Sequence, residues 1–196
     1  KTMAVALDHD PTTPASGSHS AGDPADGDAA CLLEVVSFVA GEPWSDHPQC
    51  VCPTLAAFGR AWNDALPQTD RDRLLKPFIP RLIGTRSTPD VQDRRAFMAS
   101  DWAVRTYSPV WLRAAGLDDA AASLEALPEL SSVELCRSAM PIIAEARKQA
   151  DAAWAAAGAA AWDAAWAAAW AALRPHVEML QASAADLYSR MIEVAA

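Results

Sequence analysis

The 196-residue sequence is short of cysteine, of positive charge and of known catalytic motifs. Its four cysteines are too few for a disulfide framework in a chain of this length. A net charge of −9 disfavours nucleic-acid binding by bulk electrostatics. The Gly-x-Ser-x-Gly elbow, the phosphate-binding loop, the dinucleotide-binding glycine turn and the His-Glu-x-x-His pair are all missing. The sequence therefore assigns no catalytic residue and favours a non-enzymatic protein.

Strand signals are missing as well, since no stretch alternates apolar and polar residues over a strand's length. Apolar residues recur instead at helical spacing from position 29 onward. The first helix is predicted over 29–40, with Gly41 closing it, and Pro53 and Pro89 are placed to open later helices. Pro109 is expected to interrupt the helix in which it lies. The pattern predicts an all-α fold, a multi-helix bundle.

Composition divides the chain into a tail and one domain. Residues 1–28 are rich in proline, glycine, serine and aspartate, which is typical of a disordered or extended tail. His19 of this tail is expected to be exposed and without a role. Residues 29–196 are predicted to form a single all-α domain. Short helices build 29–130, and a long Ala/Trp-rich helix followed by an amphipathic helix builds 131–196.

Alanine is concentrated near the end of the chain, where 16 of the 45 alanines fall within the 24 residues 150–173, the Ala/Trp segment. Alanine has the highest helix propensity. We expect an interruption at Pro141 and then one continuous helix from Pro141 to Leu173, about 48 Å long. Pro175 should open or kink the last helix.

Four tryptophans of this segment lie eight, four and four residues apart: Trp154, Trp162, Trp166 and Trp170. Four residues advance a helix by about 400°, so these side chains should form a slowly turning ridge on one face. The ridge either packs into the body of the domain or binds a protein partner, a second copy of the chain among them. A membrane span is disfavoured, because Asp151 and Asp163 would lie within the bilayer.

A second group of candidate site residues lies around the loop that precedes Pro53. His47, Cys50 and Cys52 are three zinc-type ligands within six residues, and Cys31 is a fourth from the preceding helix. The Cys-x-Cys spacing is unusual for zinc, so the alternatives are two buried structural cysteines or a reactive thiol at a helix N-terminus. We expect no bound cofactor, with zinc as the alternative.

Positive charge gathers in the middle of the chain, where residues 60–113 hold ten lysines and arginines against six acidic residues. Two interpretations are open for this basic middle: internal ion pairs, or a local site for an anion or a phosphate backbone. Because both flanks are acidic, nucleic acid is not the expected partner.

Several motifs carry a resemblance that covers nearly everything after residue 30. They are GEPWSDHPQCVCPTLAAFGRAWND, RLIGT, DRRAFMASDWAVRTYSPVWLRAAGL and LQASAADLYSRMI, together with the Ala/Trp segment. In these the chain resembles a group of alanine- and tryptophan-rich actinobacterial hypothetical proteins. The resemblance implies an intracellular setting and brings no activity, ligand or catalytic residue.

Taken together, these patterns favour a cytoplasmic, non-enzymatic helical interaction protein that binds itself or a protein partner through the tryptophan ridge. The alternative is a small-molecule- or metal-binding protein, an enzyme included, with its site in the 42–52 loop.

Overall fold

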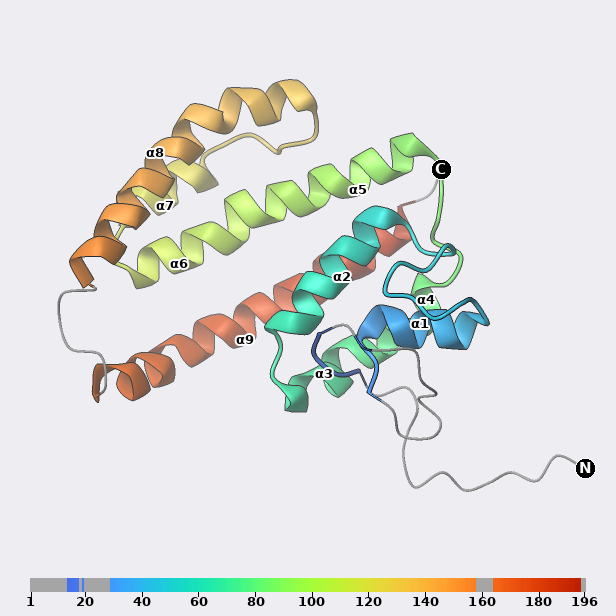
Figure 1. The fold of residues 1–196 in the computed structure, drawn as a ribbon. Coiled ribbons are helices and arrows are strands. Elements are labelled where there is room, and N and C mark those ends of the chain that lie inside the picture. Colours follow the sequence, from blue (N-terminus) through green and yellow to red (C-terminus); the bar gives the residue numbers. More distant parts are fainter. Residues whose placement is uncertain (1–13, 18, 20–28, 158–163, 195–196) are drawn as a thin grey trace, which may run out of the picture. The chain divides into compact units, whose positions relative to one another are not determined.

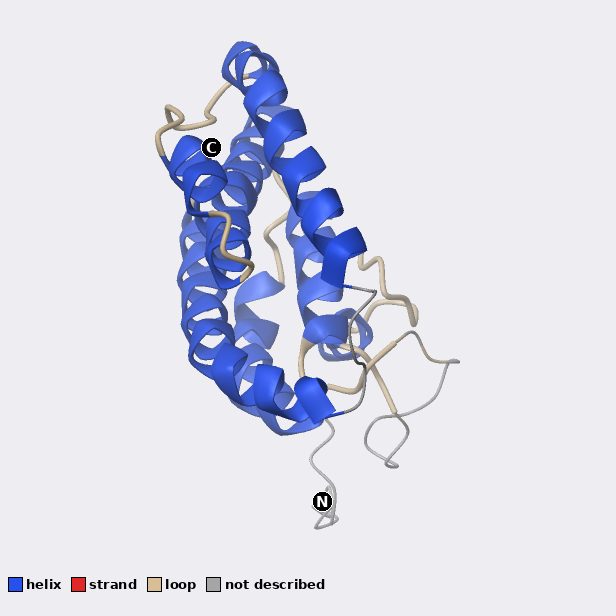
Figure 2. Cartoon of the chain, turned by 90° about the vertical axis from the view of Figure 1, so that its left-hand side faces the viewer, coloured by secondary structure: helices blue, strands red, loops and turns tan. Residues whose placement is uncertain are grey.

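The structure is a computed structural model that describes residues 14–17, 19, 29–157 and 164–194, with the backbone alone over 154–157 and 164–172. Every regular element in these ranges is helical, so the all-α prediction is confirmed (Figure 2). Contacts divide the chain into two compact units. Unit 1 is Lys1–Arg95 with Tyr188–Ala196, and unit 2 is Ala96–Leu187. Among the helices described, none has the length and apolar character needed to cross a bilayer.

Unit 1 is built from short helices (Figure 1). They are α1 (Leu32–Ala40), α2 (Pro53–Ala65), α3 (Gln68–Leu75), the 3₁₀ turn η2 (Lys76–Phe78), α4 (Ile79–Leu82), the first half of α5 (Pro89–Trp102) and the last residues of α9 (Ala164–Glu193). Helices α2 and α5 begin at Pro53 and Pro89, as predicted. A proline is tolerated there because the first helical N–H groups have no intrahelical acceptor.

Helix α1 ends as predicted at Gly41, whose φ of 70° places it in the left-handed region that glycine adopts without strain. It begins three residues later than predicted. The buried Glu34 carboxylate accepts a hydrogen bond of 2.6 Å from the Cys31 backbone N–H and so fixes the N-terminus at this point. The helix is buried over its first two turns, whereas Phe38 and Val39 near its end are exposed.

Four aromatic rings form the centre of unit 1. Tyr188 of α9 stacks on Phe58 at 5.4 Å between centroids and meets Phe78 and Trp62 edge-on at 5.0 and 5.9 Å. Its hydroxyl is fully buried and donates a hydrogen bond of 2.9 Å to the Leu55 carbonyl. This geometry fixes α9 to α2 through both packing and a hydrogen bond.

Arg95 of α5 also holds the end of α9. Its guanidinium donates to the carbonyls of Thr85 at 2.7 Å, Met191 at 2.8 Å and Val194 at 3.2 Å. These include carbonyls at the C-terminus of α9, which have no partner within the helix. Arg95 is buried, and main-chain acceptors surround its guanidinium.

Unit 2 contains the second half of α5, the π-helical turn η3 (Ala103–Tyr107), α6 (Ser108–Ala114), α7 (Asp118–Glu125), α8 (Val133–Ala157) and α9 as far as Leu187. Helices α6, α7 and α8 share one small core of Leu112, Ala120, Ala121, Leu124, Leu127, Leu130, Ala139 and Ala146. Helix α8 begins after Ser132, whose hydroxyl accepts a hydrogen bond from the Leu135 N–H, as an N-cap does.

The regular α-helix is interrupted just before Pro109, which lies in the first turn of α6, although the chain stays helical. The chain widens into η3 just before it, and the Ser108 hydroxyl donates to the Ala103 carbonyl at 2.8 Å. Widening to a π-turn accommodates a residue that lacks an N–H while the chain stays helical. Tyr107 and Ser108 therefore stand at a register that an ordinary α-helix would not give them.

Helix α8 runs through Pro141, where the sequence predicted an interruption, and α9 runs through Pro175, which was predicted to open or kink the last helix. Pro141 and Arg137, whose carbonyl loses its partner, are both exposed, so water can take the place of the missing N–H. The continuous helix predicted up to Leu173 includes residues 158–163, which lie outside the described ranges. The structure therefore shows two long helices, one on each side of these residues.

Candidate functional site

The loop before α2 satisfies its own polar groups. The Glu42 carboxylate accepts hydrogen bonds from the backbone N–H groups of Gln49 at 2.5 Å and Cys50 at 2.8 Å. The His47 Nδ1 lies 2.6 Å from a carboxylate oxygen of Asp46, and the His47 side chain is 66% exposed. The loop therefore presents His47 to solvent beside an acid.

Two of the predicted cysteine ligands have weakly acidic thiols. Burial raises the pKa of Cys31 to about 12, and burial together with the Glu42 carboxylate raises the pKa of Cys50. All four cysteines are free. Among the described residues, no three histidine, cysteine or acidic side chains gather in a way that could hold a metal ion. The zinc alternative at His47, Cys50, Cys52 and Cys31 stays a prediction.

Cys52 differs from the other cysteines because it precedes the first turn of α2. Burial opposes its ionisation. Hydrogen bonds from the Leu55 and Thr54 N–H groups and from the Arg95 guanidinium outweigh burial, so the pKa of Cys52 lies below its usual value. Its side chain is nevertheless only 1% exposed. The thiolate is stabilised at a place that a second reactant does not reach.

The predicted tryptophan ridge falls where side chains are not described. Trp154 lies in the backbone of α8, and Trp166 and Trp170 lie in the backbone of α9. Trp162 belongs to residues 158–163, outside the described ranges. The backbone is therefore helical at three of the four positions.

Ion pairs occupy part of the basic middle. Arg73 binds Asp70 at 2.9 Å, Arg105 binds Asp101 at 3.1 Å, and Arg113 binds Glu125. Arg81 pairs with Glu193 at 3.1 Å. For these arginines, the interpretation as internal ion pairs is confirmed.

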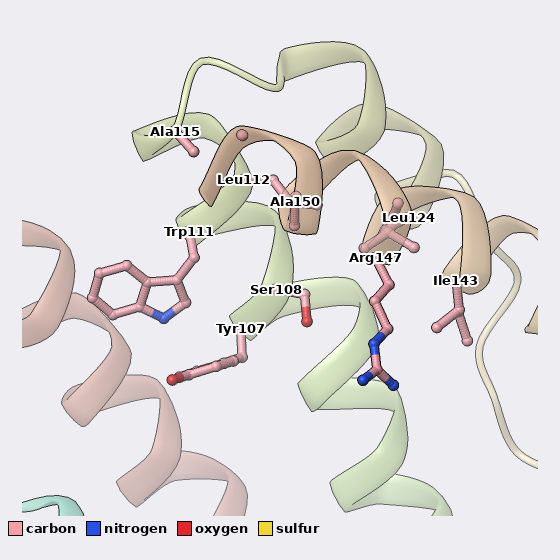
Figure 3. A pocket seen from close by; sticks show the side chains of 11 residues that line it. Tyr107, Ser108, Trp111, Leu112, Ala115, Leu124, Ile143, Arg147 and Ala150 are labelled. Atoms are coloured by element: carbon pink, nitrogen blue, oxygen red, sulfur yellow. The ribbon is translucent and has the colours of Figure 1, made fainter. Parts of the chain in front are cut away.

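An apolar pocket of about 620 Å³ lies in unit 2 between α6, α7 and α8. This unit 2 pocket is lined by Tyr107, Ser108, Trp111, Leu112, Ala115, Leu124, Ile143, Ala146, Arg147, Ala150 and Ala153. In Figure 3 the rings of Tyr107 and Trp111 project from η3 and α6, while Ile143, Arg147 and Ala150 come from α8. The small alanines of α8 leave the space that the rings border.

The polar groups of the unit 2 pocket are few. The Trp111 Nε1–H is buried, and no described atom accepts a hydrogen bond from it. The Ser108 hydroxyl is engaged with the Ala103 carbonyl. Arg147 lies 3.9 Å from Asp151 with its side chain 83% exposed, which leaves its guanidinium at the solvent side. Apolar walls with a few polar groups are typical of pockets that bind small molecules.

Sequence reasoning missed this pocket, although part of its signal is in the sequence. Ile143, Ala146, Ala150 and Ala153 recur at spacings of three and four, so one face of α8 is narrow and apolar. No protein-family model, curated protein or solved structure matches the chain.

Proposed function

We propose that the protein is a non-enzymatic helical interaction protein that self-associates, and that its unit 2 pocket receives tryptophan side chains from the Ala/Trp segment of a second copy. The apolar walls of the pocket carry this proposal. Large apolar side chains lie exposed on α8 as well, since Met140 is 56%, Val133 53% and Ile142 39% exposed. Exposed apolar surface of this kind is typical of a protein-binding face.

The energetics favour a contact of moderate strength. A tryptophan that becomes buried removes about 150–250 Å² from water. At ~25 cal/mol per Å² this contributes roughly 4–6 kcal/mol before any cost is counted. Two or three such side chains together contribute roughly 8–18 kcal/mol against an association cost of about 4–15 kcal/mol, and a surplus of about 8 kcal/mol corresponds to a micromolar dissociation constant. We therefore expect a dissociation constant in the micromolar range.

Sedimentation velocity over a concentration series tests this proposal. The unmodified chain should dimerise at roughly 100 µM, where a micromolar association is close to saturation. Filling the pocket with Ala150→Leu should weaken dimerisation by at least tenfold, and so should the combined change of Trp162, Trp166 and Trp170 to alanine. Ala144→Leu is the matched control, because Ala144 is exposed on the same helix and does not line the pocket.

A mixing experiment adds a sharper criterion. The filled-pocket variant keeps its tryptophans, and the triple tryptophan variant keeps its pocket. An equimolar mixture of the two should therefore associate more strongly than either variant alone. An unmodified chain that stays monomeric at this concentration, or a mixture that behaves as the sum of its parts, contradicts the proposal.

A small ligand is the second candidate for the same pocket, favoured by the unpartnered Trp111 Nε1–H and by the pocket's size. Its volume of about 620 Å³ falls within the range of small-molecule sites. With Arg147 at the rim, the best match is an amphipathic anion with an apolar chain.

Calorimetric titration with dodecanoate tests this candidate. We expect Ala150→Leu to abolish the binding heat and Arg147→Gln to weaken binding by roughly two- to fivefold, the amount expected for one exposed, screened charge. Lys148→Gln is the matched control, since Lys148 is the next residue and does not line the pocket. Binding that survives Ala150→Leu would place the ligand elsewhere.

The cytoplasmic setting belongs to this proposal. It is supported by the four free cysteines, which suit a reducing compartment, and by the resemblance of the chain's motifs to actinobacterial proteins.

A further inference from the structure

The described part of the N-terminal tail belongs to unit 1 and is hydrogen-bonded to its other residues. These residues, Pro14–Gly17 and His19, are called the strap here. The Ala15 N–H donates to the Ala30 carbonyl at 2.6 Å, and the Asn63 side-chain amide donates to the Ala15 carbonyl at 2.8 Å. The Gln68 side chain donates to the Pro14 carbonyl at 3.0 Å. Three hydrogen bonds therefore hold the first two residues of the strap, Pro14 and Ala15.

The far end of the strap is held in the same way. The Gly17 N–H donates to an Asp64 carboxylate oxygen at 3.0 Å, and the His19 N–H donates to Glu34 at 2.7 Å. The Trp44 indole N–H donates to the His19 carbonyl at 3.1 Å. The expectation that His19 is exposed and without a role was wrong. Its ring Nδ1 lies 3.0 Å from Glu34, and only 22% of its side chain is exposed.

The six residues that bind the strap form the peptide groove: Ala30, Glu34, Trp44, Asn63, Asp64 and Gln68. Its polar centre is built into the fold. Asn63 is fully buried and Glu34 is 1% exposed. Asn63 also accepts from the Leu32 N–H at 3.3 Å, and Glu34 also accepts from the Cys31 N–H at 2.6 Å. Unit 1 therefore orients both side chains independently of the strap.

The contacts define what the peptide groove recognises. Six hydrogen bonds reach main-chain atoms of the strap, and main-chain atoms are common to every peptide. Three strap positions depend on the side chain. Pro14 is buried, Gly17 has a φ of 83°, and the His19 ring contacts the Glu34 carboxylate. The recognised pattern is Pro-x-x-Gly-x-His in a non-helical conformation.

We propose that unit 1 carries a binding site for a Pro-x-x-Gly-x-His segment of a partner protein, and that the strap occupies this site in cis as a competing ligand. The strap is attached to α1 by few residues, so its effective concentration at the groove is in the millimolar range. A partner segment therefore binds strongly only when the cis contact is weakened. The two buried polar side chains of the groove, Glu34 and Asn63, each keep a hydrogen bond to unit 1 when the strap leaves, which permits the exchange.

Fluorescence anisotropy with a labelled peptide TTPASGSHSA, residues 12–21, tests the proposal on the full chain. The released variant combines Ala15→Pro, which removes the N–H that binds Ala30, with His19→Ala. We expect it to bind the peptide at least tenfold more tightly than the unmodified chain does. Ser16→Ala is the matched control, because Ser16 is exposed within the strap, and it should behave like the unmodified chain.

Changes in the groove itself complete the test. In the released variant, Gln68→Ala and Asp64→Ala should each weaken peptide binding several-fold, and so should alanine at the histidine position of the peptide. A released variant that is folded by circular dichroism and binds no peptide overturns the proposal. If it does not fold, His19→Ala alone takes its place. Loss of folding in both variants also overturns the proposal, because the strap would then be a fixed part of unit 1.

The strap of a second copy is the competing occupant. It would make the unmodified chain dimerise in a way that His19→Ala abolishes and the tryptophan variants do not affect. That outcome also contradicts binding to a partner protein.

Discussion

Gly59 shows how one missing side chain shapes unit 1. It lies inside α2, where alanine would favour the helix by about 1 kcal/mol. A Cβ atom at this position would stand 2.5 Å from the Tyr188 hydroxyl oxygen and 3.2 and 3.3 Å from methyl carbons of Leu32 and Leu33. The hydroxyl cannot move away freely, because it is bonded to the Leu55 carbonyl. Gly59 is thus required for the close approach of α1, α2 and the end of α9.

We predict that Gly59→Ala destabilises the protein by about 1–3 kcal/mol, the usual cost of overpacking, despite the gain in helix propensity. Tyr188→Phe alone should cost about 1 kcal/mol for the lost hydrogen bond. The double variant removes the atom that clashes, so its loss should be smaller than the sum of the two. Urea unfolding of the four proteins measures this coupling. Strict additivity would show that the hydroxyl is not the obstacle.

At the scale of helices, local signals located the ends well and the interiors poorly. Gly41, Pro53 and Pro89 each determine a terminus through their own backbone, so the sequence predicted those ends correctly. A proline inside a helix removes only one hydrogen bond. Whether the helix continues depends on what satisfies the freed carbonyl, such as solvent at Pro141. The residues next to the proline in the sequence do not determine what satisfies this carbonyl.

The candidate sites depend still more on distant residues. The unit 2 pocket needs Trp111 of α6 opposite the alanines of α8, and the peptide groove needs Glu34 and Asn63, 29 residues apart, on one surface. Periodicity shows that a helix has an apolar face but not which helix covers it. For the same reason the sequence drew attention to His47 and the cysteines, which are close in the chain, and overlooked His19.

At the scale of the whole molecule, the chain has 25 acidic and 16 basic residues. The dependence of its stability on acidic pH is therefore the measurement that reports on its carboxylates. Two glutamates have clearly lowered pKa values. Burial alone would raise the pKa of Glu34. Hydrogen bonds from the N–H groups of Cys31 and His19 and from the His19 ring outweigh burial, so the pKa lies below its usual value. Glu125 has a lowered pKa because it pairs with Arg113 at an exposed site. Only the first carboxylate lies in a core, so only the first should control stability.

We predict that Glu34→Gln reduces the free energy of unfolding by about 2 kcal/mol at pH 7, the value of a hydrogen bond to a charged group. Because the pKa of Glu34 is lower in the folded than in the unfolded protein, its charge stabilises the fold fully above the ordinary glutamate value of 4.5. This stabilisation is lost as the pH falls through the lowered value, where the folded protein also takes up the proton.

The difference in free energy of unfolding between the unmodified chain and Glu34→Gln should therefore narrow as the pH is lowered in a series of urea unfolding curves. Glu125→Gln is the matched control and should change little at any pH, since exposed ion pairs contribute about 0–1 kcal/mol. A gap for Glu34→Gln that stays constant down to the acid transition would mean that the carboxylate's charge does not stabilise the fold.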